Sequence, residues 1–213
     1  MGLLFGEERD QTVIPVTPQP EPPGFDTGVR TPGKAFLRRV SNPSREQFRK
    51  SNFWKACLPD LRQAYSEICA YSACWVPMEG SVDHFWPISV RPDRAYEWDN
   101  YRLAFQKLNS YKGNSTDVLD PFHIREGWFV LNFNNFFVEP STGLTVDIEA
   151  AVQKTISVLR LNVDDCLVQM RFNVVKDYAK GDVTFDFMVR RYPFIAIEIQ
   201  RQGLEEKIRT YFK

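Results

Sequence analysis

An acid and an imidazole stand side by side in the segment Val82-Asp83-His84-Phe85. A neutral imidazole can take a proton from water near pH 7, and a carboxylate is a hard oxygen ligand suited to Mg²⁺. Adjacent side chains on a strand point to opposite faces, so Asp83 and His84 can share one site only where the backbone bends. Asp-His pairs are common, and this one alone predicts no activity.

Three further polar residues follow the pair: Asn100, then Asn109 nine residues later, then Lys112 three beyond. Each has an ordinary interpretation, Asn100 as a helix cap and Lys112 as a surface lysine. Together with the Asp-His pair they supply what phosphodiester hydrolysis needs. One group activates water, hard oxygen ligands hold a cation, and a positive charge neutralises the phosphate.

This order of residues resembles the HNH motif of the ββα-metal nucleases, with Asn109 at the third position, where many members have His. Residues 14–26, 29–33, 95–102, 118–122 and 126–129 are similar to a bacterial family of HNH-containing proteins, so the resemblance covers most of the chain. Related HNH proteins occur as effector subunits of anti-phage systems such as Septu and Zorya.

The resemblance implies a role for each motif residue. Asp83 would be a metal ligand on the strand side and Asn109 a ligand on the helix side, with Mg²⁺ or Mn²⁺ as the cofactor. His84 would be the general base, and Asn100 would brace the loop that holds it.

The resemblance also implies DNA as the substrate, with contacts from Lys112, Arg102 and Lys107. One HNH site cuts one strand, and no zinc finger or helix-turn-helix is evident, so we expect nicking or cleavage of low sequence specificity. Two alternatives remain open. One is a catalytically inactive HNH scaffold that binds nucleic acid or protein, and the other is an interaction subunit of a larger defence complex.

The charge balance bears on unaided DNA binding. The chain has 27 basic and 27 acidic residues and a pI near 6.7, whereas phosphate neutralisation usually requires a basic excess. Between residues 30 and 62, however, nine cations face only Glu46 and Asp60. That stretch could follow a phosphate backbone or could form ordinary solvated helix faces.

The cysteines predict no structural zinc. They are Cys57, Cys69, Cys74 and Cys166, and none forms a CxxC pair. Many HNH proteins clamp their core with two such pairs. Here only Cys69 remains of the first pair, and the apolar Phe105 and Leu108 occupy the second. We expect packing by Trp75, Phe105 and Leu108 to replace the metal, and reduced thiols in a cytoplasmic protein.

The expected fold is α+β, a ββα-metal core at about 71–114 embedded in a mostly helical domain. Residues 1–34, rich in proline, are expected to be extended, and 35–213 to form one domain with helices over about 147–213. No apolar run reaches the roughly 20 residues of a membrane span. In the N-terminal half we expect a helix from Ser44 to Ala56, a second helix from Pro59 and a helix-like run from Asn100. A strand pair is expected within Gly127 to Glu139, with its turn near Asn134. Further helices are expected to begin at Asp147, Asp164 and Val183, with Pro193 ending the one from Val183, and a final helix is expected after Ile195.

Overall fold

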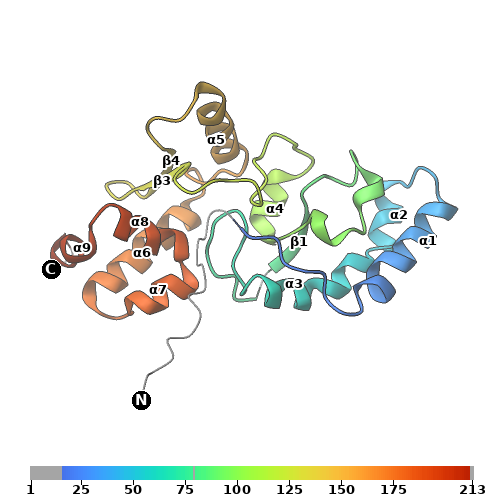
Figure 1. Ribbon diagram of the computed structural model, residues 1–213, viewed down its shortest axis with the longest axis horizontal. Coiled ribbons are helices and arrows are strands. Elements are labelled where there is room, and N and C mark those ends of the chain that lie inside the picture. Colours follow the sequence, from blue (N-terminus) through green and yellow to red (C-terminus); the bar gives the residue numbers. More distant parts are fainter. Residues whose placement is uncertain (1–15, 79, 212–213) are drawn as a thin grey trace, which may run out of the picture.

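The computed structural model describes residues 16–78 and 80–211, which form an α+β fold (Figure 1). Its two sheets each contain two antiparallel strands, β1 (Gly80–His84) with β2 (Tyr101–Phe105) and β3 (Phe129–Asn132) with β4 (Phe137–Pro140). The α-helices are α1 (Thr31–Arg39), α2 (Arg45–Lys50), α3 (Leu58–Ala64), α4 (Gln106–Lys112), α5 (Val146–Val158), α6 (Asp165–Lys180), α7 (Phe185–Arg191), α8 (Pro193–Arg201) and α9 (Glu205–Tyr211). Shorter turns of helix are η1 (Asp26–Arg30), η2 (Phe53–Cys57), η3 (Pro92–Arg94) and η4 (Trp98–Asn100).

The two strands of the first sheet separate apolar from polar side chains. Val82 is paired with Leu103, and both are buried in a core shared with α1, α2 and α3. Asp83 is paired with Arg102, and these two are buried on the other face, as the period of two requires. Helix α4 follows β2 without a loop and packs on both strands, its Leu108 fully buried.

Two clusters of buried apolar side chains form the interior. One joins the N-terminal helices to β1 and β2, and the other joins β3 and β4 to the helices from α5 onward. Figure 1 shows α1 and α2 at one end of the molecule and α8 and α9 at the other. The two halves meet where the backbone N–H of Trp75 donates to the carbonyl of Arg191, whose guanidinium lies over the Trp75 ring.

Several local predictions are confirmed. The helix predicted from Ser44 begins there as α2, with a reciprocal capping box between Ser44 and Gln47, and Pro59 lies in the first turn of α3. The helix predicted from Asp164 is α6, and the structure shows that Asp164 is its N-cap. The strand pair within 127–139 is present as β3 and β4, with the turn between them at residues 133–136.

Other predictions were wrong, mostly where proline begins a helix. Residues 1–34 were predicted to be extended. Residues 16–22 have no regular structure, but η1 and α1 make the chain helical from Asp26 to Arg39. Pro32 is compatible with this helix because it lies in the first turn of α1, where no N–H is needed. Pro193 begins α8 for the same reason instead of only ending α7. Residues 1–15, also predicted to be extended, lie outside the described residues.

Three boundaries also differ. The helix from Ser44 ends at Lys50 and gives way to η2, and α5 is preceded by Thr145, so Asp147 lies in its first turn. The run after Asn100 is β2, with the helix beginning only at Gln106. Among the described helices, none is long and apolar enough to cross a membrane.

Helix α1 packs closely on Tyr96, which predicts a steric test of this arrangement. A Cβ built on Gly33 would lie 2.1 Å from the Tyr96 Cγ, whereas one on Gly28 would meet nothing within 4 Å. Gly33→Ala is therefore expected to lower the free energy of unfolding by about 1–3 kcal/mol through overpacking. Gly28→Ala is the matched control and should change it little or raise it. Urea denaturation measures both, and equal effects of the two substitutions would contradict the packing.

Candidate active site

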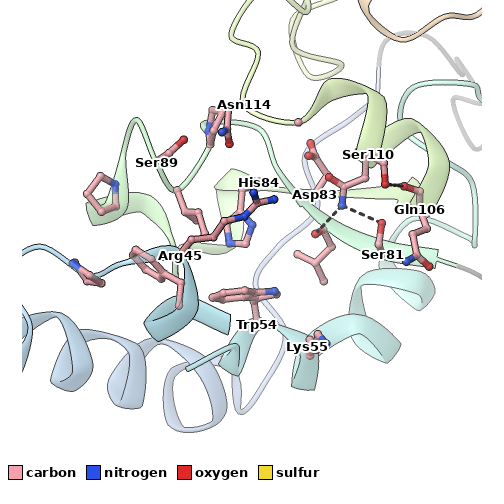
Figure 2. A pocket seen from close by; sticks show the side chains of 18 of the residues that line it. Arg45, Trp54, Lys55, Ser81, Asp83, His84, Ser89, Gln106, Ser110 and Asn114 are labelled. Atoms are coloured by element: carbon pink, nitrogen blue, oxygen red, sulfur yellow. Dashed lines mark hydrogen bonds between the residues drawn. The ribbon is translucent and has the colours of Figure 1, made fainter. Parts of the chain in front are cut away.

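A cavity of about 860 Å³ runs along the free edge of β1 (Figure 2). All five residues of β1 line it, together with residues of α2, η2, α4 and the loop after β1. Asp83 and His84 project from opposite faces of the strand, yet both reach the cavity because it follows the strand edge. The predicted bend of the backbone is therefore not what brings them together.

Asp83 is held in place by two buried donors. The Nζ of Lys112 lies 3.1 Å from its Oδ1, and the hydroxyl of Tyr71 donates to its Oδ2. Burial raises the pKa of Tyr71 well above its usual value, so the phenol stays protonated and donates. The carboxylate is thereby fixed in orientation, and each of its oxygens retains a lone pair for a further partner.

Lys112 is not a surface lysine. Its side chain has no exposed area, and its Nζ also donates to the carbonyl of His84 at 2.7 Å. The prediction that it contacts phosphate is wrong for this structure, because Asp83 and the His84 carbonyl already take up the ammonium group. It ties α4 to the end of β1 instead.

His84 is oriented by the backbone on one side and by aromatic rings on the other. Its Nε2 lies 2.9 Å from the carbonyl oxygen of Ala95, and since a carbonyl only accepts, Nε2 carries the proton. Nδ1 is left as the acceptor. The rings of Trp54 and Tyr101 pack edge-on to the imidazole at 4.8 and 5.1 Å. Burial lowers the pKa of His84 to about 4, so the ring is neutral at pH 7.

Asn109 lines the same cavity, and its amide nitrogen anchors it on β1. Its Nδ2 donates to the Ser81 hydroxyl at 3.1 Å and to the Val82 carbonyl at 3.3 Å, which anchors the side chain on the strand edge. Its Oδ1 accepts no hydrogen bond from any residue in the described ranges, while the residue lines the cavity. That oxygen is free to bind a ligand.

Asn100 holds the loop that follows His84. Its Oδ1 accepts from the N–H of Trp86, and its Nδ2 donates to the carbonyls of Trp86 and Arg94. These bonds link the two ends of residues 86–94. The carbonyl of Ala95, which follows directly, accepts the hydrogen bond from Nε2–H of His84. Asn100 therefore acts on the imidazole through the backbone, at a distance from the cavity that it does not line.

Two of the predicted DNA contacts lie elsewhere. Arg102 is 2% exposed, forms a bidentate pair with Asp120 and stacks on Phe122, so it cannot reach a phosphate. Lys107 is exposed but lies against Asp164 of the α6 cap at 2.7 Å, on a different side of α4 from Asn109. The prediction for Arg102 was wrong because Asp120, 18 residues away in the sequence, takes up its guanidinium. The DNA contact of the exposed Lys107 stays a prediction.

The structure adds residues that the motif did not reveal. Arg45, Trp54 and Lys55 line the cavity, and Tyr71 binds Asp83 from behind. Arg45 and Lys55 belong to the basic stretch noted above, which was the available signal. Nothing in the sequence around Tyr71 marks it, because its contact depends on how residues 69–76 pack on β2.

The donors fit a hard divalent cation rather than a closed metal site. Within the described ranges, no group of three or more His, Cys, Asp or Glu side chains is placed to hold a metal. Asp83 and Asn109 offer two oxygen ligands beside open space, as Mg²⁺ prefers, since it keeps several waters or phosphate oxygens in its shell. Cys69 and Cys74 are free and buried, and Cys69 belongs to the same apolar cluster as Leu108.

The burial of His84 predicts a pH effect. Because the pKa of the ring is about 4 in the folded chain and about 6.5 when unfolded, the unfolded state binds more protons between these values. Stability is therefore fully present above pH 6.5 and falls toward pH 4, by up to about 3 kcal/mol from this group. In a His123→Gln variant, which leaves His84 as the one histidine, the ring resonances should titrate near pH 4 by NMR. A midpoint near 6.5 would contradict the burial.

No protein-family model and no curated protein sequence matches this chain.

Proposed function

We propose that this protein is a metal-dependent endonuclease of the HNH type that hydrolyses DNA phosphodiester bonds, one strand at a time. One observation carries the proposal. A neutral imidazole of fixed tautomer, a fixed carboxylate and a free amide oxygen open onto one cavity, supplied by two antiparallel strands and the helix that follows them. This is the donor set that hydrolysis of a phosphodiester requires.

The chain's own residues do the proton transfer and the positioning. His84 takes a proton from water at Nδ1, and the Ala95 carbonyl stabilises the imidazolium that forms by accepting from Nε2. A pKa of about 4 makes the free ring a weak base, and a phosphate bound beside it raises that pKa because it stabilises the cation. Asp83 and Asn109 would hold Mg²⁺ or Mn²⁺, which when bound polarises the phosphate and stabilises the departing 3′ oxygen.

The resemblance to HNH effectors extends the proposal to defence against foreign DNA, with other subunits as partners. Zero net charge is consistent with a partner that delivers DNA to the cavity.

A second candidate is an inactive scaffold of the same fold, and one observation favours it. The buried Lys112 ammonium already neutralises Asp83, and it opposes a divalent cation at the same carboxylate. The two candidates differ in whether Asp83 binds a metal and whether His84 is needed for cleavage.

Cleavage of supercoiled plasmid by the purified protein in Mg²⁺ or Mn²⁺ tests the proposal. We expect nicked circles, none in EDTA, and a loss of about 10²- to 10⁴-fold in rate for His84→Ala, since that is the usual contribution of a general base. Ser89→Ala, at the exposed rim of the cavity, is the matched control and should nick normally. Nicking that survives in His84→Ala or in EDTA would refute the mechanism, and no nicking in any condition would favour the scaffold.

A thermal measurement tests the metal ligands without activity. Lys112→Met leaves the Asp83 charge buried without its cation and should cost about 3–5 kcal/mol. If Asp83 binds Mg²⁺, adding Mg²⁺ should raise the melting temperature of Lys112→Met more than that of the wild type, because the metal replaces the lost charge. The double variant Asp83→Asn/Lys112→Met carries neither charge and should respond least. Equal responses of all three proteins would exclude Asp83 as a ligand.

A further inference from the structure

The basic stretch between residues 30 and 62 divides into two groups. Four of its cations form ion pairs with carboxylates: Arg30, Lys34, Lys50 and Arg62. The other five form no ion pair within the described ranges and are exposed: Arg38, Arg39, Arg45, Arg49 and Lys55. Free cations on a surface of a chain with zero net charge are available to bind an anion.

Three of the free cations border the cavity or continue from it. Arg45 and Lys55 line it, and Arg49 lies one helical turn beyond Arg45 on the same side of α2. In Figure 2, Arg45 extends toward His84, while Lys55 lies on the other side of Trp54. We call these three residues the cationic rim.

Among the described residues that line the cavity, Asp83 is the one acid, and Lys112 already neutralises it. On α2 itself, Glu46 is paired with Lys50. The rim therefore presents its charge to whatever enters the cavity.

The aromatic lining favours a duplex over a single strand. Proteins that bind single strands stack unpaired bases on free aromatic faces. Trp54 packs instead against His84 and Tyr96, and Phe48 is buried. The indole N–H of Trp54 donates to no group in the described chain, so what this residue offers a ligand is a hydrogen-bond donor.

We propose that the cationic rim binds the phosphate backbone of double-stranded DNA on both sides of the phosphate that faces His84. Arg45 and Arg49 contact phosphates on one side and Lys55 on the other, in the role that the sequence had suggested for Lys112 and Arg102. The position of the scissile phosphate opposite His84 rests on the proposed nuclease function. The binding of double-stranded DNA by the cationic rim does not depend on that function. Because these contacts reach phosphates and not base edges, binding is independent of sequence.

Equilibrium binding measured without divalent cations tests the rim separately from cleavage. The wild type and the triple variant Arg45→Gln/Arg49→Gln/Lys55→Gln are titrated in EDTA into a fluorescent 20-bp duplex at several salt concentrations. The slope of log K against log salt should decrease in magnitude by about 0.9 for each cation removed. The three side chains are exposed, so the circular dichroism of the variant should match the wild type.

Lys180→Gln, an exposed lysine at the end of α6 that forms no ion pair in the described chain, is the matched control and should leave the slope unchanged. An unchanged slope in the triple variant, no binding of duplex by the wild type, or tighter binding of a 20-nucleotide single strand would each overturn the inference. If the triple variant shows the smaller slope but the wild type nicks no plasmid, the nuclease proposal is refuted and the cationic rim is retained. If the wild type nicks plasmid but the slope of the triple variant is unchanged, the nuclease proposal is retained and the cationic rim is refuted.

Discussion

The buried ion pair between Lys112 and Asp83 is the interaction on which the candidate site depends. It joins the last turn of α4 to β1, and the same ammonium holds the carbonyl of His84. A buried charge left without its partner costs several kcal/mol, so strand and helix must dock in one arrangement for either charge to be satisfied. That arrangement in turn places the Asn109 amide on the strand edge, where the residue lines the cavity. One interaction thus sets the geometry of three motif residues.

Around this pair, the polar residues of the candidate site act in two layers. Asn100 and Tyr71 do not line the cavity along β1, but Asn100 fixes the loop beside His84 and Tyr71 fixes the carboxylate of Asp83. Their hydrogen bonds are made within the protein, so the orientation of His84 and Asp83 is set before any ligand arrives. Such preorganisation is what gives fixed dipoles and bases their effect in catalysis.

Features that depend on a few neighbouring residues could be predicted from the sequence, whereas features that depend on contacts between distant segments could not. The capping box at Ser44 and the place of Pro59 in the first turn of α3 depend on a few neighbouring residues, and both predictions were correct. Tyr101–Phe105 was taken for helix because a short apolar run has no period that separates a buried strand from a helix. In the site, the motif named Asp83, His84 and Asn109, all of which line the cavity. It misassigned Arg102 and Lys112, whose burial depends on carboxylates 18 and 29 residues away in the chain.

The contact between Trp75 and Arg191 makes the candidate site depend on the C-terminal helices. Residues 69–76 carry Tyr71 and pack in the same core as the C-terminal helices, while Glu67 binds Arg191 directly. The hydroxyl that orients Asp83 is therefore supported by residues more than a hundred positions downstream. A graft of the two strands and α4 onto another scaffold would carry the motif but leave behind the support of its carboxylate. In this protein the smallest transferable site is much larger than the motif by which it is recognised.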